Sequence, residues 1–206
     1  NSGISVSMNS AGDRVAIGGH YNDGTASDAG HVRIYQYASG SWSQLGADID
    51  GEAQGDLFGR SVSMNSAGDR VAIGAENNDG NGSNAGHVRI YEYSSGSWSQ
   101  LGADIDGEAG SDRSGYSVSM NSTGDRVAIG AWQNDGTASN AGHVRIYQYA
   151  SGSWSQLGSD IDGEAADDYS GYSVSMNSSG DRVAIGAWQN DGTASNAGHV
   201  RIYQYA

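Results

Sequence analysis

The chain repeats itself every 56 residues along its whole length. Its four methionines, Met8, Met64, Met120 and Met176, are each 56 positions apart, and one histidine per unit keeps the same spacing. The 206 residues divide into complete units at 1–56, 57–112 and 113–168 and a shorter unit at 169–206, with no separate linker. Periods of this length are typical of propellers and solenoids. We therefore treat 1–206 as a single repeat domain.

Each complete unit carries four strand signals and no helix signal. In the first unit these are Ile4–Met8, Arg14–Gly18, His31–Tyr37 and Trp42–Asp50, in which β-branched and aromatic residues alternate with small polar ones. The short polar segment 9–13 predicts a tight turn between the first two strands. The fourth segment alternates less cleanly, but we expect one strand there as well.

Four antiparallel strands per unit predict an all-β fold, a β-propeller of about four blades. The fourth unit is 18 residues short, because 206 is three times 56 plus 38, and the missing residues correspond to the fourth strand. We therefore expect 15 strands, a last blade without its outer strand, and an unpaired edge at 199–205. The length favours a four-bladed ring.

Composition alone would misclassify this chain. Val, Ile, Leu and Phe together number 29 residues, about 14% of the sequence, and the net charge is −14. Such values are typical of disordered segments. The repeat changes this interpretation, because stacked units share the burial of their faces with their neighbours.

The charge and the absent residue types exclude several functions. Ten Lys and Arg residues against 24 Asp and Glu argue against a nucleic-acid surface and against docking to anionic lipid. No apolar run is long enough to predict membrane insertion. With no cysteine, the chain has no disulfide, thiolate nucleophile or Cys-ligated metal.

The segment FGRSVSMNSAGDRVAIGA, at 58–75, resembles the FG-GAP repeat of integrin α-chain propellers. Phe58-Gly59 matches the opening FG, and Gly74-Ala75 matches the GA of GAP, although the final Pro is absent. The fuller unit, with SGSWSQLG and DIDGEA, is similar to tandem repeats of large extracellular proteins of marine microbes. The resemblance implies an extracellular or cell-surface module for adhesion or scaffolding. From the unpaired edge and the end faces we expect head-to-tail contacts between copies in a larger extracellular assembly. Other extracellular proteins or glycans are the further partners that we expect.

Calcium is the one ion for which the sequence offers candidate ligands, but we expect no cofactor. FG-GAP propellers often hold calcium between the first two strands, but here Asn65–Asp69 offers a single carboxylate. The DIDGE segments offer three carboxylates per complete unit: Asp48, Asp50 and Glu52; Asp104, Asp106 and Glu108; Asp160, Asp162 and Glu164. We favour pairing of the two aspartates with Arg14- or Arg33-type side chains of a neighbouring blade, or exposure to water, over a metal site.

The remaining repeated polar residues predict structure rather than chemistry. The four NDG segments, such as Asn22-Asp23-Gly24, are typical of turns. The histidine that opens each third strand recurs a blade apart, so we expect a repeated structural hydrogen bond. We predict that the chain is not an enzyme, because no unique polar cluster marks a catalytic residue.

Most positions are the same in every unit, but two sets differ. Before the first-strand core the units read Ile4, Arg60, Tyr116 and Tyr172; after the second strand they read His20-Tyr21, Glu76-Asn77, Trp132-Gln133 and Trp188-Gln189. Antiparallel pairing places both sets at one end of the blades, where they should ring one face. The alternative to a structural or adhesive module is therefore a carbohydrate-binding propeller with a site at Tyr116, Trp132, Tyr172, Trp188, Arg60 and Glu76. Relaxed constraint in loops is the other explanation.

Two further expectations concern side-chain exposure. Trp42, Trp98 and Trp154 should be mostly buried, and Trp132 and Trp188 more exposed. Asn81, Asn121 and Asn177 fit the N-glycosylation pattern and lie in predicted turns, so we expect them to be accessible.

Overall fold

The computed structural model describes residues 2–205, which form antiparallel sheets and loops without a helix. The first sheet contains β1 (Ser5–Met8), β2 (Arg14–Gly19), β3 (His31–Ala38), β4 (Ser41–Gln44) and β5 (Ile49–Asp50). The second contains β6 (Ser61–Met64), β7 (Arg70–Ala75), β8 (His87–Ser94), β9 (Ser97–Gln100) and β10 (Ile105–Asp106). The third contains β11 (Ser114–Met120), β12 (Arg126–Ala131), β13 (His143–Ala150), β14 (Ser153–Gln156) and β15 (Ile161–Asp162). The fourth contains β16 (Ser170–Met176), β17 (Arg182–Ala187) and β18 (His199–Gln204).

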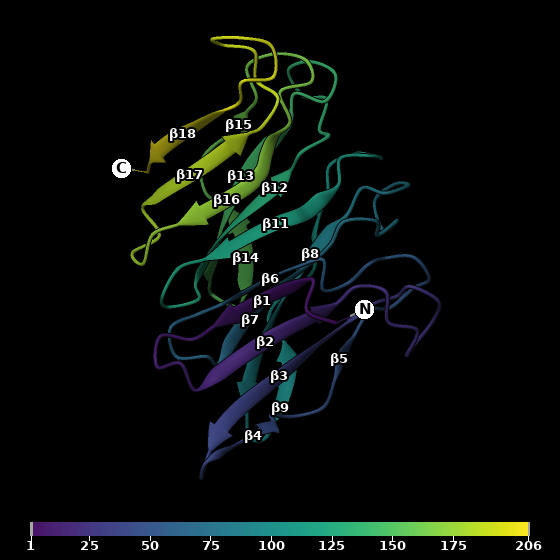
Figure 1. Ribbon diagram of the computed structural model, residues 1–206, viewed down its shortest axis with the longest axis vertical. Coiled ribbons are helices and arrows are strands. Elements are labelled where there is room, and N and C mark those ends of the chain that lie inside the picture. The colour runs from purple at the N-terminus through teal and green to yellow at the C-terminus, as the bar shows by residue number, and fades with distance from the viewer. Residues whose placement is uncertain (1, 206) are drawn as a thin grey trace.

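These sheets are the blades of a β-propeller, numbered 1 to 4 in chain order, and they follow one another through the molecule in Figure 1. The expected fourth strand is in fact two short strands, which gives 18 strands within residues 2–205 instead of 15. In blade 1, β4 and β5 both pair with β3, at its two ends. The positive φ of Gly46, between them, belongs to the turn that interrupts the strand. The fourth blade lacks both of these strands, as the sequence predicted.

An asparagine, buried in blades 1 to 3, fixes the turn between the first two strands of each blade. The Asn9 side-chain oxygen accepts hydrogen bonds from the backbone N–H of Asp13 at 3.1 Å and of Arg14 at 2.9 Å, and its amide donates to the Asp13 carboxylate at 2.7 Å. Asn65, Asn121 and Asn177 repeat much of this arrangement. The predicted accessibility is therefore wrong for Asn121, which is 3% exposed and holds its turn together.

Neighbouring blades pack through two different faces. We call the face with Ala16, Val32 and Ile34 in blade 1 the leading face, and the face with Val62, Met64, Val71 and Ile73 in blade 2 the trailing face; together they form one buried apolar cluster. The corresponding residues of blades 2 and 3, and of blades 3 and 4, form two more clusters. The core thus lies between blades, which is why so few large apolar residues suffice.

Small inner-strand residues let the blades approach closely near the axis. The hydroxyl of Ser5 donates to the carbonyl oxygen of Gly59 in the next blade at 2.8 Å. A Cβ on Gly18, which lies beside this contact, would overlap that same carbonyl oxygen. Glycine is therefore required here by space rather than by backbone conformation.

The structure does not show a closed ring. The leading face of blade 4 and the trailing face of blade 1 are both largely exposed within residues 2–205. The two blades lie at opposite ends of the long axis in Figure 1.

Candidate functional site

The variable positions gather at one end of the inner strands, as the sequence predicted. In blade 3, Ser114 pairs with Ala131 while Ser117 pairs with Gly130, so the strand bulges between them and carries Tyr116 at the bulge. Trp132 follows β12 directly at the same end. The same bulge in β16 places Tyr172 beside the end of β17, where Trp188 follows.

The aromatic rings of blades 3 and 4 form one continuous cluster. Tyr116 contacts Tyr172 at 4.8 Å and Trp132 at 5.3 Å between ring centroids. Tyr172 contacts Trp132 at 5.8 Å and Trp188 at 5.6 Å. Tyr172 and Trp188 are exposed, so the cluster has a solvent-facing side.

Blade 2 extends this cluster with a charged pair. The Arg60 guanidinium lies 4.2 Å from the centroid of the Tyr116 ring, a cation–π distance, and donates a 3.0 Å hydrogen bond to Glu76. Burial raises the pKa of the Glu76 carboxyl, and the charge of Arg60 opposes that rise. Burial and the Tyr172 hydroxyl raise the pKa of Tyr116 to about 12.

In blade 1 the residues at these positions contribute less. Ile4 is exposed, His20 is buried against Tyr21, and burial lowers the pKa of the His20 imidazole. The inner strands of all four blades nevertheless line one open groove of about 420 Å³, which includes Arg60, Tyr116 and Tyr172.

Sequence reasoning missed Tyr169, which lies between the two tryptophans. Its ring is 5.1 Å from Trp132 and stacks against Trp188 at 5.9 Å with an 18° interplanar angle. Tyr169 has a positive φ of 54°, and Leu57 and Arg113, the equivalent residues of earlier units, share this strained conformation. The residue type at this position differs between the three units, and this difference could have identified Tyr169 from the sequence.

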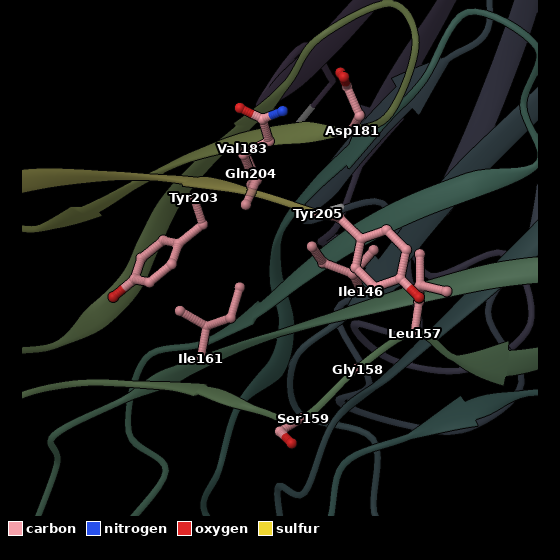
Figure 2. A pocket seen from close by; sticks show the side chains of 10 residues that line it. All are labelled: Ile146, Leu157, Gly158, Ser159, Ile161, Asp181, Val183, Tyr203, Gln204 and Tyr205. Carbon is pink, nitrogen blue, oxygen red and sulfur yellow. The ribbon is translucent and has the colours of Figure 1, made fainter.

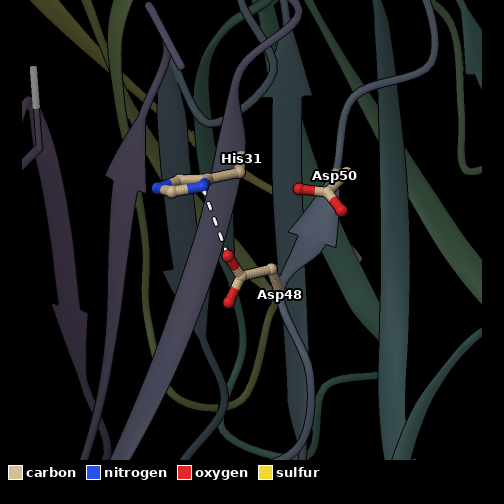
Figure 3. Close-up of side chains that lie close together, drawn as sticks. All are labelled: His31, Asp48 and Asp50. Carbon is tan, nitrogen blue, oxygen red and sulfur yellow. Dashed lines mark ion pairs between the residues drawn. The ribbon is translucent and has the colours of Figure 1, made fainter. Parts of the chain in front are cut away.

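A second group of polar residues lies between blades at the third strand. His31, Asp48 and Asp50 lie close together in blade 1, and the His31 Nδ1 is 3.6 Å from the Asp48 carboxylate (Figure 3). The equivalent clusters are Glu52, His87 and Asp104, and Glu108, His143 and Asp160. Burial lowers the pKa of each of these histidines, and that of His87 falls to about 4.

Arginine already occupies the cation position in these clusters. Arg33 makes two-pronged hydrogen bonds to Asp48, and Arg89 bridges Asp104 and Glu52 with contacts of 2.7 and 2.6 Å. Arg145 and Arg201 lie 3.5 Å from Glu108 and Glu164. The positive charge of a guanidinium repels a metal cation at the same place. These residues therefore fit an ion-pair network better than they fit a metal site. Asp48 and Asp104 pair with the arginine of their own blade, so the expected pairing of the aspartates with a neighbouring blade is wrong for these two. The ion pairs between blades come from glutamates, as in Glu52–Arg89.

The expected histidine hydrogen bond is wrong for His143, since neither ring nitrogen of this 1% exposed side chain has a partner. The NDG interpretation agrees with the structure. The Asn22 side chain accepts from the Gly24 N–H at 2.8 Å, and the Asp23 side chain from the Asp28 N–H at 2.8 Å.

A third feature is an empty slot of about 180 Å³ between blades 3 and 4, lined by Leu157, Gly158, Ile161, Tyr203 and Tyr205 (Figure 2). At the two earlier junctions an indole fills this place. Trp98 donates to the carbonyl oxygen of Leu45 and Trp154 to that of Leu101, at 2.8 and 2.7 Å. The slot is therefore the tryptophan position of the strands that blade 4 lacks.

The family comparison agrees with this architecture. Residues 47–91 match the model of the FG-GAP repeat. This segment is an FG-GAP repeat. The resemblance is thereby confirmed for this stretch.

Solved structures share the fold. One is "a putative 6-phosphogluconolactonase from Bacteroides uniformis ATCC 8492", with a TM-score of 0.64 and 12% identity over 99% of this chain and 53% of that one. Another is the hydrazine synthase of Kuenenia stuttgartiensis, with a TM-score of 0.58 and 15% identity over 98% of this chain and 58% of that one. The chain thus spans little more than half of each. No curated protein sequence matches it.

These structures correct the prediction that the chain is not an enzyme. That prediction treated repeated all-β blades without a unique polar cluster as evidence against catalysis, and both structures with this fold are described as enzymes. The exclusion therefore fails. At 12–15% identity the likeness shows the fold alone, and neither activity is carried over to this chain.

The part of the chain that the structure describes contains no helix suited to crossing a membrane.

Proposed function

We propose that this FG-GAP module binds carbohydrate through the aromatic cluster of Tyr116, Trp132, Tyr169, Tyr172 and Trp188. The single observation that supports the proposal most strongly is the convergence of these rings from two blades onto one partly exposed patch. Aromatic faces pack on the apolar C–H faces of sugar rings, and nearby polar groups fix the orientation of a ligand. Arg60 and Glu76, at the edge of the cluster, supply such groups.

The location of the cluster supports binding rather than folding as its role. The rings lie at positions that differ between otherwise repeated units, while the core positions keep their residue types. We place the module outside the cell or on its surface, where the FG-GAP resemblance implies adhesive partners.

A glycan array followed by titration tests the proposal. Trp188→Ala and Tyr172→Ala should each weaken binding at least tenfold, and the double variant Trp132→Ala plus Trp188→Ala should abolish it. Trp42→Ala and Tyr37→Ala are matched controls, because both rings are similarly exposed but lie at the β3–β4 hairpin. No bound glycan, or equal losses in the controls, would refute the proposal.

A further inference from the structure

Blade 4 ends in an apolar surface that is buried in every other blade. Val200 and Ile202, on its leading face, are 65% and 73% exposed, while the equivalent Val32 and Ile34 of blade 1 are fully buried. Ala184, beside them, is also less buried than its equivalents. Nothing in residues 2–205 covers this surface.

Blade 1 has the opposite surface unpaired. Val6 and Met8, on its trailing face, are 65% and 54% exposed, while Val62 and Met64 of blade 2 are 9% and 7% exposed. The two exposed surfaces are thus the two halves of an interface that the chain forms three times internally.

Blades 1 and 4 also carry the polar groups that accompany this interface. Within the chain, Ser61 donates to the Gly115 carbonyl, and Ser117 to that of Gly171, both at 2.7 Å. Ser173 is the next serine in this series, and Gly3 lies at the equivalent position in the first unit.

A second series continues in the same way. Arg70 and Arg126 donate to the carbonyls of Gly124 and Gly180 at 3.2 and 3.0 Å. Arg182 is the next arginine, and Gly12 is the equivalent glycine of the first unit. Donors on blade 4 therefore match acceptors on blade 1.

We propose that two copies of this chain associate head to tail, with the trailing face of blade 1 of one copy docked on the leading face of blade 4 of the other. The register is that of the internal junctions: Ser173 donates to Gly3 of the second copy, Arg182 donates to its Gly12, and Val200 and Ile202 pack against its Val6 and Met8. Such a heterologous contact either closes into a ring or continues as a filament, depending on the rotation between copies.

This contact is weaker than an internal junction for two reasons. Within residues 2–205 blade 4 has no outer strands, so Trp42 of the second copy finds no leucine carbonyl of the kind that Trp98 and Trp154 bind. Each copy also carries a net charge of −14, and this repulsion is screened by salt. Association should therefore strengthen as ionic strength rises.

Sedimentation velocity of the 206-residue chain, with Ile202→Glu and Val6→Glu as single-face variants, tests the proposal. The wild type should associate in the concentration range of about 10–500 μM. Each variant alone should be monomeric, because every head-to-tail contact needs both faces. An equimolar mixture of the two should give a species of two chains and nothing larger, since it retains one intact pair of faces. Both side chains are exposed in the single chain, so neither substitution touches its core.

Ala38→Glu adds the same charge at the exposed β3–β4 hairpin and should leave association unchanged. A wild-type monomer throughout this range overturns the proposal. So does association of Val6→Glu alone, which indicates a symmetric contact between β18 faces or edges. Loss of association in Ala38→Glu likewise overturns it, because the contact would then depend on charge and not on the two faces.

Discussion

The indole Nε1 of Trp98 donates a 2.8 Å hydrogen bond to the carbonyl oxygen of Leu45, in the preceding blade. The same ring lies over Gly46, where an added Cβ would be 2.8 Å from its Cδ1 atom. One side chain of an outer strand therefore joins two blades by packing and by hydrogen bonding. Within residues 2–205 no blade precedes that of Trp42, whose side chain is 45% exposed, so its predicted burial is wrong.

We expect Trp98→Ala to lower the free energy of unfolding by about 2–4 kcal/mol, because it removes a large packed ring and leaves a cavity. Trp154→Ala should behave in the same way. Trp42→Ala, the matched control, should cost under about 1 kcal/mol. Urea denaturation measures all three, and equal losses would contradict the assignment.

Gly74→Ala should be strongly destabilising, by about 3 kcal/mol or more, because the new methyl group overlaps the carbonyl oxygen of Gly115 in the next blade. Gly186→Ala is the matched control in blade 4, where only the mobile hydroxyl of Ser173 is in the way. We expect it to cost about 1 kcal/mol or less. If both changes have the same effect, the tight spacing between blades is not what requires glycine.

Arg89→Met should lower the free energy of unfolding by about 2–4 kcal/mol, because Glu52 and Asp104 then lose a shared partner that is only 12% exposed. Arg33→Met should cost no more than about 1 kcal/mol, since Arg33 is 43% exposed and pairs with Asp48 alone. Thermal or chemical denaturation of both variants checks this ranking.

The same network predicts that calcium is not required for folding. Guanidinium groups balance the carboxylates that a cation would otherwise hold. The melting temperature should therefore be unchanged by a chelator such as EDTA. A decrease of more than about 10 °C, which corresponds to several kcal/mol for a domain of this size, would contradict the prediction.

Stability should decrease as the pH falls from 7 toward 5. Burial and then the charge of Arg89 lower the pKa of His87 to about 4, whereas an unfolded histidine has a pKa near 6.5. The unfolded chain therefore binds the proton first, and the free energy of unfolding falls with pH below about 6.5, by at most about 1.4 kcal/mol per pH unit for this group. The His87→Gln variant should show a shallower decrease. Carboxyls with raised pKa values, such as Glu76, have the opposite effect, because they bind protons more readily in the folded state and so add stability as the pH falls. These carboxyls are the same in both proteins. The difference between the wild-type and His87→Gln slopes of unfolding free energy against pH therefore measures the contribution of His87.

The repeat made most of the fold predictable, because a spacing of 56 residues identifies equivalent strands and turns without any knowledge of contacts. The end of the blades where Tyr116 and Trp132 meet also followed from antiparallel pairing. Burial was less predictable where it depends on neighbours: Trp42 and Trp98 have the same local sequence, but only Trp98 has a preceding blade. Asn121 shows a similar limit, since its glycosylation pattern does not indicate that the side chain already accepts hydrogen bonds from the backbone of its own turn.

Because the blade faces are nearly identical, few contacts distinguish the correct neighbouring blade from an incorrect one during folding. The leading face of blade 2 would accept blade 4 almost as well as blade 3, since the core residue types are the same. Phe58 is an exception, because serine takes its place at the later junctions, at Ser114 and Ser170. Correct order must then come chiefly from the short connections between units, which make the next blade along the chain the cheapest to reach in loop entropy. Errors in this protein should therefore be whole-unit skips with native-looking interfaces, a kind of misfolding that measurements of secondary structure would barely detect.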